Sequence, residues 1–212
     1  MRHTVLNNHP ISGLYGITPD MADTDDLLAR TEQVLKGGAR LIQYRNKAAD
    51  EALRHDQAKS LLQLCQSYGI PMIVNDHVNL AAEIDADGVH VGAHDTGIKT
   101  ARRLLGANKI IGASCYNALE LAIQAEKNSA DYIAFGAFYP TLTKQAAVVA
   151  PISILNNAKK MLTVPIVSIG GINLTNALPL IKSGVDAVAI CSALYQTEDP
   201  CNTAETFARF FD

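Results

Sequence analysis

Short runs of apolar residues, many of them β-branched, recur eight times along the chain and alternate with longer amphipathic segments. The short runs have the length of buried strands. They occupy residues 13–18, 41–45, 72–75, 88–91, 110–114, 132–135, 166–170 and 187–191. The segments between them carry apolar residues at helical spacing, most clearly at residues 25–38, 50–69, 117–130 and 203–211. The pattern therefore predicts strands and helices in alternation.

Alternating strands and helices favour a parallel sheet, because each helix carries the chain back across the sheet in a right-handed crossover. Eight such units in 212 residues match a closed (β/α)8 TIM barrel near its lower size limit. An open doubly wound sheet is the alternative, but it normally has fewer strands and a GxGxxG turn, which is absent here. We expect one TIM-barrel domain over residues 1–212, with residues 1–12 as an N-terminal extension.

Composition and charge restrict the classes of partner. The net charge of −3 and the pI near 6.0 disfavour a broad nucleic-acid-binding face. No apolar window approaches the ~20 residues of a membrane span, and the first residues lack the apolar segment of a signal peptide. The four cysteines have no CxxC spacing and are predicted to be reduced thiols. We expect a cytoplasmic protein with neither membrane nor nucleic-acid partners.

The second apolar run continues into the segment LIQYRNK, which changes from apolar to charged within seven letters. Alternate residues of a strand project to one face, so Gln43, Arg45 and Lys47 would converge there. Ile42 and Tyr44 would pack on the other face. Two cations beside an amide indicate an anion site, although a strand that simply emerges into water is the alternative.

Polar residues also end or follow the other predicted strands, whose carboxyl ends surround the active site in this fold. Lys144 adds a third cation, and three cations indicate a ligand as highly charged as a diphosphate. Asp76 and Asp95 follow adjacent strands, and two carboxylates facing a polyanion favour a shared Mg²⁺. Each aspartate also precedes a helical segment, so helix capping is its alternative role.

A second anion site is predicted after the seventh and eighth strands, where this fold often binds phosphate. Gly170 and Gly171 would let backbone N–H groups approach a phosphate at the start of a helix, and Ser192 follows the eighth strand. Further hydroxyl groups end or follow the fifth and sixth strands, at Ser114, Thr141 and Thr143. Two anion sites imply two small phosphorylated substrates.

Histidines offer weaker signals. His90 lies between two valines within the fourth strand, where a packed or hydrogen-bonded role is favoured over that of a catalytic base. His77 and His94 neighbour the two aspartates and are candidates for supporting hydrogen bonds. No Ser-His-Asp arrangement with identifiable spacing is present, which disfavours a covalent hydrolase.

The motifs QYRNK, VNDHVNLA, DGVHVGAHD, IIGASCYN, FGAFYPTLTK, SIGGIN and ICSALYQTEDP, taken in this order, closely resemble the thiamine phosphate synthase family. The resemblance covers nearly the whole chain from Gly13 onward, and the combination is far more specific than any single motif. It implies a TIM barrel that joins hydroxymethylpyrimidine diphosphate to thiazole phosphate with Mg²⁺ and releases pyrophosphate. Substitution would be dissociative, with pyrophosphate leaving before the thiazole nitrogen attacks.

The resemblance also implies roles for individual residues. Ligands of the pyrimidine diphosphate would be Gln43, Arg45, Lys47, Asn75 and Lys144. The magnesium ligands would be Asp76 and Asp95. Contacts around the reacting centre and the thiazole phosphate would be Ser114, Thr141, Thr143, Gly171, Cys191 and Ser192. Among these, we assign the catalytic roles to Arg45, Lys47, Lys144 and Ser114.

Several positions depart from the common family pattern, namely His77, Ala93, His94, Cys115, Tyr116 and Cys191. None of these removes a carried-over charged residue, so they bear on the surroundings of the metal and of the thiazole phosphate. Three other functions stay open, which are a thiazole tautomerase, a sugar-phosphate isomerase or epimerase, and a catalytically silent phosphate sensor. Formation of a homo-oligomer is also left open.

Overall fold

The computed structural model describes residues 11–92, 97–140 and 149–212. Its strands are β1 (Gly13–Ile17), β2 (Leu41–Tyr44), β3 (Met72–Asn75), β4 (Gly88–Val91), β5 (Ile110–Tyr116), β6 (Tyr132–Phe135), β7 (Ile166–Ile169) and β8 (Ala187–Ile190). Its helices are α1 (Thr24–Lys36), α2 (Glu51–Ser67), α3 (Val78–Glu83), α4 (Ile98–Leu105), α5 (Leu119–Lys127), α6 (Ser153–Met161), α7 (Ala177–Lys182), α8 (Ser192–Tyr195) and α9 (Pro200–Arg209).

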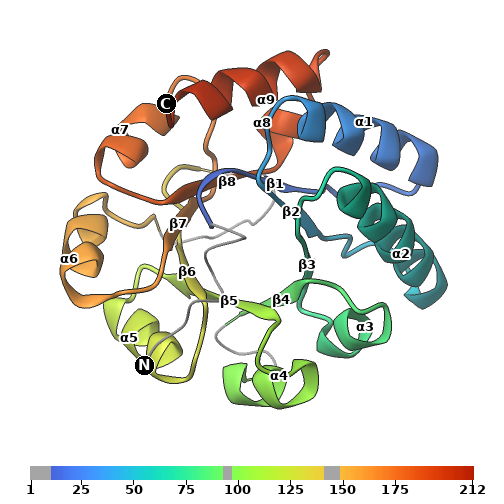
Figure 1. The fold of residues 1–212 in the computed structure, drawn as a ribbon. Coiled ribbons are helices and arrows are strands. Elements are labelled where there is room, and N and C mark those ends of the chain that lie inside the picture. The colour runs from blue at the N-terminus through green and yellow to red at the C-terminus, as the bar shows by residue number, and fades with distance from the viewer. Residues whose placement is uncertain (1–10, 93–96, 141–148) are drawn as a thin grey trace.

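The eight strands form a closed parallel barrel in the order of the sequence, and β1 pairs with both β2 and β8. Figure 1 shows the strands at the centre and the helices in a ring around them. This arrangement confirms the predicted (β/α)8 TIM barrel. All four cysteines are free thiols in this structure. No described helix is both long and apolar enough to cross a membrane.

Aspartate side chains determine where several helices begin. Asp23, Asp50 and Asp199 each accept a hydrogen bond from a backbone N–H in the first turn of α1, α2 and α9 respectively. Such caps satisfy donors that have no partner inside the helix. At the other end of α1, Gly37 and Gly38 close the helix through N–H bonds to the carbonyl groups of its last turn. The predicted stop of this helix is therefore confirmed.

A second set of aspartates ties the strands together at the opposite, amino-terminal end of the barrel. Asp87, Asp131 and Asp186 directly precede β4, β6 and β8, and each accepts a bond of 2.7 to 2.8 Å from a backbone N–H at the start of the preceding odd-numbered strand. The same aspartate contact therefore occurs at three strand pairs, β3–β4, β5–β6 and β7–β8. It holds the closed end while the carboxyl ends stay available for ligands.

The barrel wall separates two apolar layers. The larger layer lies between the strands and the surrounding helices, and includes Ile42, Tyr44 and Phe135. The smaller layer fills the barrel interior, with side chains such as Tyr15 and Tyr132. Successive residues of a strand point to opposite faces, so each strand contributes to both layers. The predicted outward packing of Ile42 and Tyr44 is confirmed.

Polar side chains run through the barrel interior in one hydrogen-bonded series. The Gln43 amide donates to the Tyr15 hydroxyl at 2.6 Å, and this hydroxyl lies 2.8 Å from that of Tyr132. His90 Nδ1 lies 2.9 Å from the Tyr132 hydroxyl, and His90 Nε2 lies 2.8 Å from Ser114 Oγ. Buried polar groups require such partners, since an unpaired one costs about 1–3 kcal/mol. The prediction of a hydrogen-bonded barrel histidine at His90 is confirmed.

Gly112 makes room for this series. It pairs in register with His90 on one side and with Tyr132 on the other, and the two rings stack with centroids 5.5 Å apart. A Cβ atom at position 112 would overlap the Tyr132 ring. The small residue is therefore required by the large ones beside it.

We expect Gly112→Ala to lower the free energy of unfolding by about 2–3 kcal/mol, because overpacking displaces a buried ring. Chemical denaturation measures this change. Gly97→Ala is the control, since a Cβ there meets no atom of the described residues within 4 Å and its φ is negative. Equal stability of Gly112→Ala and the wild type would contradict the close packing of Tyr132 on this glycine.

Candidate active site

The carboxyl ends of the strands bring several of the predicted residues to one rim of the barrel. Gln43 is buried just below this rim, while Arg45 and Lys47 follow β2. The strand itself ends at Tyr44, so the period-two projection expected through Lys47 is wrong beyond Gln43. A turn, and not a continuous strand, places the two cations.

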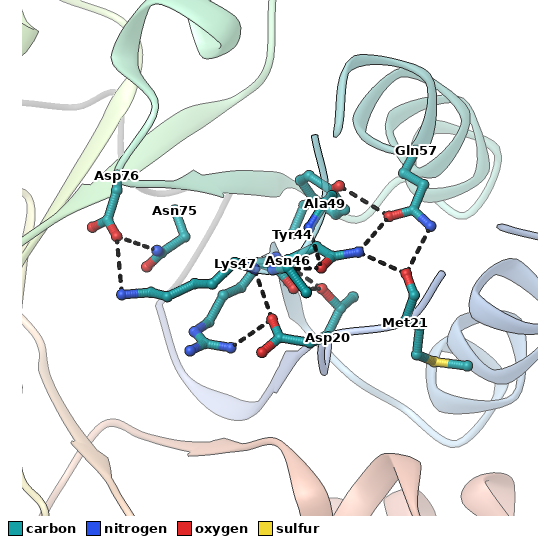
Figure 2. Close-up of polar contacts among 12 residues, drawn as sticks. Asp20, Met21, Tyr44, Asn46, Lys47, Ala49, Gln57, Asn75 and Asp76 are labelled. Atoms are coloured by element: carbon teal, nitrogen blue, oxygen red, sulfur yellow. Dashed lines mark hydrogen bonds and ion pairs between the residues drawn. The ribbon is translucent and has the colours of Figure 1, made fainter. Parts of the chain in front are cut away.

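Asn46 makes that turn. Its side-chain oxygen accepts bonds from the backbone N–H groups of Ala48 and Ala49, and its amide donates to the Met21 carbonyl at 2.6 Å. The same amide donates at 3.0 Å to the Gln57 side chain on α2, which in turn donates to the Met21 carbonyl. Figure 2 shows Asn46 and Gln57 meeting at this carbonyl. The loops after β1 and β2 are thereby tied to one helix.

Asp20 positions the backbone and side chain of the cationic segment. Its Oδ1 accepts a bond of 2.7 Å from the Lys47 backbone N–H and lies 3.1 Å from Arg45 Nη1. The Arg45 backbone is also held by Thr18, whose hydroxyl accepts from its N–H and donates to its carbonyl. The Arg45 side chain is only 16% exposed, so its guanidinium is held at the rim and partly shielded from water.

Lys47 reaches across the rim from β2 toward β3. Its Nζ lies 3.6 Å from Asp76 Oδ2, and the Asn75 amide donates to the same oxygen at 2.7 Å. Figure 2 shows the extended Lys47 side chain approaching Asp76 beside Asn75. Lys47 is 60% exposed, so it is free to move toward an incoming anion. Three of the predicted residues therefore meet at one carboxylate.

The alternative role of Asp76 was helix capping. The cap position of α3 is taken by His77, which makes no side-chain cap bond, and Asp76 lies one residue earlier with a positive φ of 60°. Few residues other than glycine adopt this conformation readily. Its backbone N–H is fixed by a 2.9 Å bond to the His90 carbonyl on β4. The backbone therefore turns the carboxylate toward the rim.

The glycine pair after β7 also has unusual backbone conformations. Gly170 and Gly171 have φ values of 98° and 64°, and a Cβ at Gly171 would strike the Pro140 carbonyl oxygen. The Asn176 amide holds the Gly171 carbonyl at 3.0 Å, and the Tyr139 hydroxyl donates to the Asn176 carbonyl. The described parts of the loops after β6 and β7 are thus packed together.

The end of β8 is followed by two of the predicted site residues, Cys191 and Ser192. Ser192 is the first residue of α8, where no intrahelical acceptor exists for its N–H group. Burial raises the pKa of the preceding Cys191 thiol to about 11, and the positive charge of Arg45 counteracts this rise in part. Strand β1 pairs with both β2 and β8, so the segment after β8 and the cationic segment after β2 lie on either side of β1.

Four predicted residues lie outside the described residues, and they are Asp95, Thr141, Thr143 and Lys144. Gln43, Arg45, Lys47, Asn75, Asp76, Ser114, Gly171, Cys191 and Ser192 are all described. Each of these nine lies in the carboxyl-terminal part of a strand or in the segment that directly follows it. The shared edge expected from the strand order is confirmed for this set.

Comparison with known proteins identifies the family. A family model described as "Thiamine monophosphate synthase" matches residues 14–194. The chain belongs to this family. Thiamine-phosphate synthase from Nitrosomonas eutropha is 53% identical over 201 residues, which are 95% of this chain and 95% of that protein. The one from Nitrosospira multiformis is 51% identical over 201 residues, or 95% of this chain and 86% of that protein.

Solved structures agree with the thiamine monophosphate synthase family. Thiamine phosphate pyrophosphorylase from Pyrococcus furiosus superposes with a TM-score of 0.86 at 35% identity and covers 97% of this chain and 98% of its own. A 3-hexulose-6-phosphate synthase has a TM-score of 0.74 at 16% identity, with coverage of 93% and 99%. The second likeness shows a shared fold only.

Sequence reasoning missed the residues that hold the candidate site in place. Asp20, Asn46 and Gln57 carry no motif of their own, although Asn46 lies within the QYRNK segment. Tyr15 and Tyr132 look like ordinary strand residues in the sequence. Because successive strand residues point to opposite faces, the alternation within each strand could have indicated that these two tyrosines face the barrel interior.

We expect Asn46→Ala to lower the free energy of unfolding by about 2 kcal/mol, because it leaves buried donors and acceptors without partners. Thermal and chemical denaturation measure the loss. Asn157→Ala, on the exposed side of α6, is the matched control and should change stability by less than about 0.5 kcal/mol. Similar values for both variants would contradict the role of Asn46 in tying the loops.

Proposed function

We propose that this chain joins hydroxymethylpyrimidine diphosphate to thiazole phosphate, forming thiamine phosphate and pyrophosphate. Membership of the thiamine monophosphate synthase family supports the reaction class. The observation that carries the proposal to individual residues is the convergence of Lys47, Asn75 and Asp76 at one rim beside Arg45. A catalytically silent sensor would have no need for this combination of cations and carboxylate.

The charges fit a diphosphate ligand at the ends of β2 and β3. Arg45 lies against Asp20 and Lys47 against Asp76, so both cations have carboxylate partners. These pairs are partly exposed, and such pairs contribute little stability. A diphosphate can therefore recruit both cations at small cost. The glycine pair at Gly171 and the start of α8 at Ser192 support a second site for the thiazole phosphate.

The donors also fit Mg²⁺, with Asp76 and Asp95 proposed as its protein ligands. Asp76 offers a carboxylate at the rim that is about 29% exposed, and Asn75 fixes its orientation through Oδ2. Mg²⁺ usually takes one or two carboxylates and completes its coordination with water and substrate phosphate. When bound, the ion would neutralise charge on the leaving diphosphate.

The reaction that suits this site is a dissociative substitution. The bond between the pyrimidine methylene carbon and the diphosphate oxygen breaks first, and its electron pair leaves with pyrophosphate. Arg45, Lys47 and Lys144 would stabilise the negative charge that develops there. The thiazole nitrogen then forms the new bond to the methylene carbon. No protein nucleophile is needed, because charge stabilisation and alignment of the two substrates supply the catalysis.

The direct test incubates the purified protein with both substrates and detects thiamine phosphate and pyrophosphate by mass spectrometry. Reactions with Mg²⁺ and with a chelator run in parallel. We expect product only when both substrates and Mg²⁺ are present. Rearrangement of a single thiazole substrate would instead indicate a tautomerase, and conversion of a sugar phosphate would indicate an isomerase or epimerase.

We expect Arg45→Ala to lower turnover by roughly 10²-fold, the effect of losing one preorganised charge-stabilising contact. Steady-state kinetics with both substrates measure this change. Arg209→Ala removes an exposed arginine that pairs with Glu205 on α9, far along the chain from the rim, and should leave turnover unchanged. Wild-type kinetics in Arg45→Ala would reject the proposed stabilisation of the leaving group by this residue.

A further inference from the structure

We propose that the buried series from Gln43 to His90 is a positioning relay that fixes the direction of the Ser114 hydroxyl. The relay consists of Gln43, Tyr15, Tyr132 and His90, and it ends at Ser114 on the rim. The proposal rests on the proposed function for the role of Ser114 beside the reacting centre. The hydrogen-bond directions do not depend on the proposed function, because they are inferred from the donor at Gln43 and the order of the series.

The direction of the relay is set at Gln43, its first member. The Gln43 Nε2 group can only donate, so the Tyr15 hydroxyl oxygen accepts its bond of 2.6 Å. Tyr15 must then place its own proton elsewhere, and the Tyr132 hydroxyl oxygen lies 2.8 Å away. The Tyr132 proton in turn points to His90 Nδ1, at 2.9 Å. Each group in the series therefore donates its hydrogen bond to the next one, in the direction of Ser114.

The polarity selects one tautomer of His90. A neutral imidazole that accepts at Nδ1 carries its proton on Nε2. Nε2 lies 2.8 Å from Ser114 Oγ, so His90 donates and Ser114 accepts. The Ser114 hydroxyl proton is then left for another acceptor. On the open side of the barrel, that acceptor is the bound substrate.

Burial keeps the relay in this state. Tyr15 and Tyr132 are fully buried, and burial raises the pKa of each phenol well above its usual range. Both phenols therefore keep their protons at any neutral pH. The His90 and Tyr132 rings stack on each other, and the Tyr132 ring fills the space beside Gly112, which supports this geometry. His90 acts through Ser114, and is thus a positioning residue.

Tyr132→Phe tests the relay, because it removes one hydroxyl and leaves the ring. We expect turnover to fall about 10-fold, the rate equivalent of one buried hydrogen bond, with little change in KM. Tyr195→Phe is the matched control: its hydroxyl is buried on the outer side of the barrel, against Thr31 of α1. This control should lose a similar amount of stability and keep its turnover.

A double-mutant cycle separates the relay from a general packing role. Ser114→Ala should lower turnover by roughly 10²-fold, as expected for a lost donor near the reacting centre. Adding Tyr132→Phe to Ser114→Ala should then cause no further fall, because the relay has no remaining target. A further 10-fold fall in the double variant would overturn the proposal. His90→Gln, which can still donate near the Nε2 position, should retain more turnover than His90→Ala.

A measurement that needs no activity distinguishes failure of the relay from failure of the proposed function. Two-bond ¹H–¹⁵N spectra report the tautomer of each histidine, and His90→Gln assigns the His90 signal. We expect the Nε2–H tautomer in the wild type and a mixture of tautomers in Tyr132→Phe. An Nδ1–H tautomer in the wild type would overturn the relay. The Nε2–H tautomer in a protein that forms no thiamine phosphate would count against the proposed function alone.

Discussion

Closure of a parallel sheet is the constraint on which the candidate site depends. Because all eight strands run in the same direction and β1 pairs with β8, their carboxyl ends surround one small area. Arg45 and Asp76 come from different strands and still share that rim. The amino-terminal end is meanwhile closed by aspartates that bind strand N–H groups, at Asp87, Asp131 and Asp186. Stability and ligand binding are thus assigned to opposite ends of the same barrel.

The candidate site also separates its charged groups from the hydrogen-bonded groups that support them. The charged groups lie at the open rim, where solvent lowers the cost of charge before any ligand arrives. Asp20 holds Arg45 and Lys47 at the rim, while the supporting groups beneath it are neutral and buried, with Asn46 and Gln57 between the loops and Tyr15 and Tyr132 inside the barrel. Neutral networks suit this purpose, because a buried charge would need a partner and would bind its neighbours more strongly than the ligand.

Much of the fold could be predicted, because eight apolar runs alternate with amphipathic segments and parallel topology follows from that order. The strand-end residues could be predicted for the same reason, including Asn75 and Ser114. The path of the chain after β2 could not, since it depends on Asn46 bonding to Met21 and Gln57 in other segments. Strand alternation is a local rule, and it fails where such tertiary contacts end the strand at Tyr44.

The hydrogen-bonded series inside the barrel shows how a core can contain polar groups and still have a defined arrangement of its side chains. A core of Leu and Val side chains alone would leave the orientation of a rim hydroxyl to solvent and ligand. In this barrel the hydroxyls of Tyr15 and Tyr132 each have two hydrogen-bond partners within the series from Gln43 to His90. Burial holds the phenols of Tyr15 and Tyr132 in their protonated form by raising the pKa of each. The two phenols therefore keep their protons at neutral pH, and in the proposed relay they serve to orient the Ser114 hydroxyl.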